Sequence, residues 1–145
     1  SFGTDVFVSG GKIVVVDPYN DAIATDGGAI YAFHPTTGAL LGSLKGSHAG
    51  DHLGKSDSGS GRVIQASPLD SSNELLIVNP GWNANAGAIT FFRAGSVTSN
   101  EVVSDANSFV GANAGDSVGS GGFQQVYGPA GTGLLFGCPG VCGGS

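Results

Sequence analysis

An internal repeat constrains this chain more than any other feature. A glycine-rich segment at residues 46–54 recurs at residues 111–119, with glycine, alanine, glycine, aspartate and glycine in the same register. Further echoes join residues 28–33 to 87–92, and residues 13–18 to 75–80 and 134–139. A unit of about 60 residues therefore recurs, which predicts a repeat architecture.

The composition favours many turns and short buried strands. The 145 residues include 27 glycines and 6 prolines, yet 40% are hydrophobic. This mixture is typical of an all-β fold rather than of disorder. The net charge of −6 opposes binding to nucleic acid or to anionic membranes. No apolar run approaches the roughly 20 residues of a membrane span, so none is expected.

Runs rich in β-branched and aromatic residues predict ten short strands with almost no helix. In the first unit, residues 1–54, the expected strands are 6–8, 12–16, 29–33 and 40–44. In the second, residues 55–119, they are 62–66, 75–78, 88–92 and 101–103. A half unit, residues 120–145, contributes 124–127 and 134–137. We therefore expect two four-stranded antiparallel meanders and half of a third.

The motif pattern resembles a known repeat family. Phe2-Gly3, the run at 14–18, the segment 28–33 and the turn at 49–54 resemble the FG-GAP type of β-propeller repeat. Segments in the second half are similar to repeats of bacterial haemagglutinin-like surface proteins: residues 79–83, 86–90 and 115–122. The resemblance implies about two and a half propeller blades. Such propellers serve adhesion, partner binding and, occasionally, catalysis.

Many FG-GAP blades carry a calcium-binding loop between their first two strands. At the corresponding positions only Asp70, Asn73 and Glu74 offer several oxygen ligands close together. Calcium takes six to eight oxygens, so an ordinary turn is the preferred interpretation and a Ca²⁺ site the alternative. No other cofactor is expected.

Shared aspartates and glycines predict two structural turns. Asp51 and Asp116 can each stabilise a β-turn through the side chain. His48 and His52 have a spacing that would suit zinc on a helix, but they lie in a glycine turn and lack counterparts in the second copy. The residues expected to shape the turns are Gly50, Asp51, Gly54, Gly115, Asp116 and Gly119.

Three residues are candidates for ligand contact. Trp82 follows Pro80-Gly81 in a polar loop, where an exposed ring could stack on a sugar or anchor a partner, although packing between blades is the preferred alternative. Asn20 and Asp21 lie in another polar loop and could join such a contact.

The only cysteines, Cys138 and Cys142, flank a Pro-Gly turn. Low lysine, no methionine and abundant glycine, serine and asparagine suggest an extracellular bacterial protein, where a disulfide between them would be stable. Free thiols and metal binding are the alternatives. The same composition predicts location at the cell surface or in the medium.

No segment of the sequence contains a motif that indicates a particular reaction, and we expect no catalytic residues. The predicted function is a non-enzymatic structural or adhesive repeat protein that associates with its own copies into an oligomer or filament. The alternatives are a lectin-like module that binds carbohydrate or a surface protein, an enzyme, and a fragment of a larger surface propeller.

Overall fold

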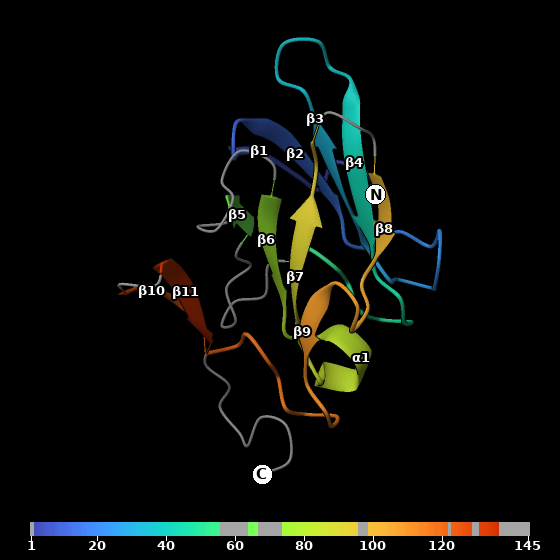
Figure 1. The fold of residues 1–145 in the computed structure, drawn as a ribbon. Helices are drawn as coiled ribbons and strands as arrows, with labels where there is room; N and C mark the ends of the chain where they lie inside the picture. Colours follow the sequence, from blue (N-terminus) through green and yellow to red (C-terminus); the bar gives the residue numbers. More distant parts are fainter. Residues whose placement is uncertain are drawn as a thin grey trace.

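The computed structural model describes residues 2–55, 64–66, 74–95, 99–121, 123–128 and 131–136 (Figure 1). This part of the chain forms antiparallel sheets with almost no helix, as the sequence predicts. The one helical element among the described residues, α1 (Trp82–Asn85), is a single turn in which Asn83 and Ala84 have positive φ angles of 48° and 56°. No helix in the described residues is long and apolar enough to cross a membrane.

The first sheet begins with a four-stranded antiparallel meander. Its strands are β1 (Asp5–Ser9), β2 (Lys12–Asp17), β3 (Ala29–Phe33) and β4 (Leu40–Lys45). A fifth strand, β8 (Ser99–Val102), pairs with β4 in parallel. The first unit is thus the meander that its strand pattern predicts, extended by a strand from the second.

The second sheet has the order β5-β6-β7-β9. Its strands are β5 (Ile64–Ala66), β6 (Glu74–Asn79), β7 (Ala88–Arg93) and β9 (Ser108–Val110). The hairpin of β10 (Phe123–Gly128) and β11 (Gly131–Phe136) follows. In Figure 1 this hairpin lies on the β5 side of the second sheet, away from β9.

The prediction of the fourth strand in the second unit was wrong. Residues 101–103 were expected to complete that meander, but residues 99–102 form β8 and pair with the first sheet. The fourth position belongs to β9, which pairs with β7 so that Phe109 lies opposite Ile89. In the first sheet, Leu44 lies opposite Ile30 in the same way.

A longer connection explains this exchange. Residues 34–39 join β3 to β4, whereas residues 94–107 join β7 to β9 and leave room for β8 to cross to the first sheet. Gly42 permits the close approach, because a Cβ there would lie 2.5 Å from Ser99 Oγ. Asn100 Oδ1 then accepts hydrogen bonds from Ser43 Oγ at 2.9 Å and Lys45 Nζ at 2.6 Å. Strand β8 therefore ties the two units together.

The main core lies between the two sheets. One face of the first sheet contributes Val14, Val16, Ile30, Ala32 and Leu44 to it. The facing side chains of the second unit are Leu75, Ile77, Ala88, Phe92, Ala94, Val103, Trp82 and Ala86. A smaller cluster, formed by Leu76, Val78, Ile89, Val118 and Phe91, lies on the opposite face of the second sheet. The second sheet is therefore apolar on both faces, which is typical of a unit stacked between others.

Candidate functional site

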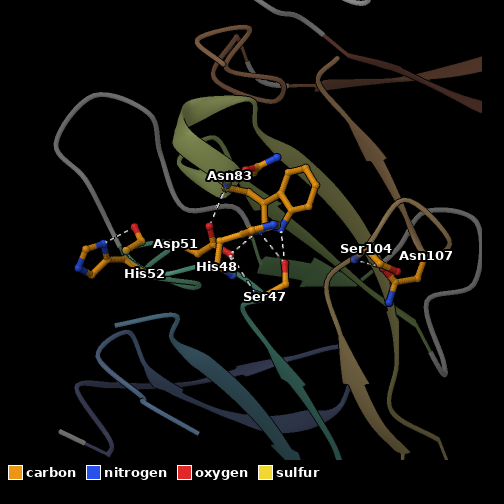
Figure 2. Close-up of polar contacts among 9 residues, drawn as sticks. Ser47, His48, Asp51, His52, Asn83, Ser104 and Asn107 are labelled. Atoms are coloured by element: carbon orange, nitrogen blue, oxygen red, sulfur yellow. Dashed lines mark hydrogen bonds and ion pairs between the residues drawn. The ribbon is translucent and has the colours of Figure 1, made fainter. Parts of the chain in front are cut away.

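The candidate site is the joint between the two units, which is built around Asp51. This side chain is only 2% exposed, and its Oδ2 atom accepts hydrogen bonds from the backbone N–H groups of Ser47 at 3.0 Å and His48 at 2.8 Å (Figure 2). The carboxylate thereby closes the glycine turn that follows β4. Such local acceptance is the role that aspartate commonly takes in turns.

The other oxygen of Asp51 reaches across to the second unit. Its Oδ1 atom accepts a hydrogen bond from the backbone N–H of Asn83 at 2.8 Å. Beside it, Trp82 donates from Nε1 to Ser47 Oγ at 2.9 Å, and its ring lies edge-on to His48 with centroids 5.1 Å apart. One buried carboxylate and one indole therefore link the turn of the first unit to α1 of the second.

The second glycine turn repeats the local geometry. Asp116 is 9% exposed and its Oδ2 atom accepts from the backbone N–H of Asn113 at 2.9 Å. In the first turn Leu53 N donates to Gly27 O, and in the second Val118 N donates to Ala86 O, both at 3.0 Å. The sequence echo thus corresponds to an equivalent set of backbone contacts.

Two glycines make this geometry possible. Gly28 and Gly87 have φ angles of 81° and 84°, where L-residues other than glycine are strained. A Cβ on Gly28 would lie 2.4 Å from Leu53 N, and one on Gly87 would lie 2.3 Å from Val118 N. Each turn therefore packs directly on the backbone at the start of the third strand of its own unit.

The candidate ligand contacts fall in different places. Trp82 is 7% exposed and belongs to the main core, which agrees with packing between units rather than an exposed platform. Asn20 Nδ2 donates to Asp17 Oδ2 at 3.1 Å, and its Oδ1 accepts from Ala22 N at 3.0 Å. Asp21 is exposed, and its Oδ1 accepts from Asp26 N at 2.8 Å. Neither Asn20 nor Asp21 is among the residues that line the pocket beside Trp82.

Ser47, His48 and Asp51 do not have the geometry of a proton relay. Ser47 Oγ and Asp51 Oδ2 both approach the same nitrogen of His48, Nδ1, at 3.0 and 3.6 Å. A catalytic histidine instead transfers a proton at one ring nitrogen while an acid orients the other. His52 turns away, with Nδ1 2.7 Å from Gly50 O and its ring against Tyr19. These side chains are engaged in turn structure.

The metal and disulfide candidates lie mostly outside the described residues. Asp70, Asn73, Cys138 and Cys142 all fall there, so those predictions stay predictions. Glu74, the third calcium candidate, is 6% exposed, and its Oε2 atom lies 3.6 Å from Arg93 Nε. Among the described residues, no three His, Cys, Asp or Glu side chains form a group that could hold a metal ion.

Sequence reasoning missed an open groove on the outer face of the second sheet. It has a volume of about 820 Å³, and Phe91, Phe109, Glu101, Asp105 and Asn107 are among its lining residues. The rings of Phe91 and Phe109 meet edge-on at 5.9 Å, and Phe109 is 56% exposed. Aligning residues 108–110 with the end of β4 through the repeat would have identified Phe109 as the counterpart of Leu44, but not its exposure.

One carboxyl group in the groove is perturbed. Burial raises the pKa of the Glu101 carboxyl, and the nearby charge of Glu74 raises it further. Hydrogen bonding to the Arg93 backbone, the Arg93 charge and a hydrogen bond with Asn107 oppose these effects without cancelling them. Glu101 is half-buried where it lines the groove.

A family model described as a repeat of unknown function (DUF5650) matches residues 71–120. That range contains β6, β7, β9 and the second glycine turn, so it covers most of the second unit. No curated protein and no solved structure was found to match the chain. The comparison supports a repeat architecture and assigns no activity.

Proposed function

We propose that this chain is a non-enzymatic structural or adhesive repeat protein of the cell exterior that associates with its own copies. Its sheets would be blades of β-propeller type, related to FG-GAP repeats, stacked in sequence. The observation that carries the proposal is the joint at Asp51, where buried polar contacts lock one unit to the next. Rigid repeats that present loops are well suited to extended surfaces.

The chemistry of the joint supports a structural role. Ser47, His48 and Asp51 lie together at the joint, and each is engaged in holding the turn or Trp82. The lectin-like alternative named Trp82, Asn20 and Asp21 as contacts, and of these the Trp82 ring is buried. The extracellular assignment rests on composition, as does the compatibility with a disulfide.

Light scattering and electron microscopy of the purified 145-residue chain test the proposal. We expect ordered oligomers or filaments at micromolar concentration, with no turnover of general hydrolase substrates. A stable, well-folded monomer would contradict self-association. Labelling of intact cells of the source organism with an antibody would test location at the cell exterior.

A further inference from the structure

The internal interface joins two different faces of the repeat. The strand registers show that Val14 and Ile30 in the first unit are equivalent to Leu76 and Ile89 in the second. The face of each sheet that carries these residues is called the socket face. The opposite face, called the plug face, carries Ile13, Val15, Tyr31 and Phe33 in the first unit and Leu75, Ile77, Thr90 and Phe92 in the second. Inside the chain, the socket face of the first unit packs on the plug face of the second. The contact is therefore heterologous and can in principle repeat.

The socket face of the second unit is incompletely covered. Phe109 occupies the position that Leu44 holds in the first unit, opposite the equivalent isoleucine. Leu44 is fully buried beneath the next sheet, whereas Phe109 is 56% exposed above the groove. The β10–β11 hairpin lies away from this end of the sheet (Figure 1). The second unit covers this apolar position in the first repeat, at Leu44, whereas the equivalent position in the second repeat, at Phe109, is exposed.

The plug face of the first unit is exposed along its edge strand, β1. Across β1, β2 and β3, Val8 lies opposite Ile13, which lies opposite Phe33, and this row is apolar throughout. Val8 is 71% exposed and Val6, in the neighbouring row, is 56% exposed. Phe7, which lies between them on β1, packs instead against the main core. The outer face of the first sheet therefore presents apolar side chains to solvent.

From these two surfaces we infer that the plug face of the first unit in one copy packs on the Phe91–Phe109 end of the socket face in a second copy. The inference rests on the proposed self-association and specifies its surfaces. The expected partner is a second copy of the chain, because the same two kinds of face already form the buried interface between its units. A contact between different surfaces that does not close extends into a filament, and one that closes makes a ring.

Complementation between two variants tests this inference. Val8→Asp places a charge on the plug face and Phe109→Asp places one on the socket face. Each variant loses the burial of one apolar side chain at the contact. Each should therefore weaken assembly by about tenfold or more. Mixed together, the two variants should form a dimer and stop there, because each retains the surface that the other has lost. Multi-angle light scattering over a dilution series measures all three samples.

Val102→Asp is the matched control. This valine is 37% exposed on β8 and does not line the groove, so its variant should assemble like the wild type. Val6→Asp provides a second plug variant, and circular dichroism checks that each chain is folded. The wild type could assemble while the single variants assemble equally well, or while the mixture yields no dimer. Either result would show that the contact surfaces are assigned wrongly, and the proposed function would stand. A wild type that stays monomeric overturns both.

Discussion

The backbone N–H of Asn83 donates a 2.8 Å hydrogen bond to Oδ1 of Asp51, a residue 32 positions earlier in the chain. This contact joins two repeat units through a carboxylate that is almost fully buried. A buried charge is stable only when hydrogen bonds replace the water that it loses. The three backbone donors around Asp51 meet that requirement.

Replacing Asp51 should therefore destabilise the fold more than replacing its counterpart. Asp51→Ala leaves three backbone donors without their acceptor and should cost about 3 kcal/mol or more of unfolding free energy. Asp116→Ala, the matched variant, removes a contact within one turn and should cost about 1–2 kcal/mol. Urea denaturation measures both. Equal losses would show that the contact between units contributes little.

Trp82 should report on the same joint. It is the only tryptophan and is buried, so its fluorescence should be blue-shifted in the folded chain and shift to longer wavelength on unfolding. Trp82→Phe removes the donor to Ser47 Oγ and should cost about 1–2 kcal/mol, whereas Trp82→Ala also opens a cavity and should cost about 3–5 kcal/mol. Emission from folded wild type at the wavelength of exposed indole would contradict the buried position.

The glycines beneath the turns can be tested against a control with a similar backbone angle. Gly87→Ala should cost about 2–4 kcal/mol, because it adds a clash with Val118 N to an unfavourable φ. Gly38 has a φ of 71°, and a Cβ added there would meet nothing within 4 Å, so Gly38→Ala should cost only about 1–2 kcal/mol. Thermal or urea unfolding compares the two. Losses of the same size would mean that close packing does not matter at Gly87.

Glu101 should make stability depend on pH. Because burial raises the pKa of this carboxyl in the folded state, the folded chain binds the proton more tightly than the unfolded chain. Its contribution is favourable below the unfolded pKa and is lost as the pH rises through the folded pKa. Glu101→Gln should therefore raise the melting temperature at neutral pH and change it little under acidic conditions. A melting temperature lowered at neutral pH would contradict the direction of the shift.

The disulfide between Cys138 and Cys142 stays a prediction of the sequence. Intact mass of native material without reductant measures it directly. A mass that rises by two hydrogens on reduction indicates the bond, whereas an unchanged mass indicates free thiols. Alkylation before and after reduction provides the control.

The sequence by itself determined the repeat, the all-β class and most strands of the first unit. These features depend on the local alternation of apolar and polar residues and on turn residues. Gly28 and Asp51 have counterparts in the second copy, Gly87 and Asp116, that adopt the same local geometry. Expectations based on nearest neighbours along the chain held where the connections are short, as between β3 and β4.

Only the tertiary structure decided where β8 pairs, that Trp82 is buried, and that Phe109 is exposed. A run such as residues 99–102 is compatible with either sheet, because strand propensity does not specify a partner. In the folded chain Gly42 has no side chain and leaves room for Ser99, which comes from a distant part of the sequence. The position of Trp82 likewise involves the first unit, because Ser47 contacts Trp82 and Asp51 contacts Asn83 only once the two units have stacked.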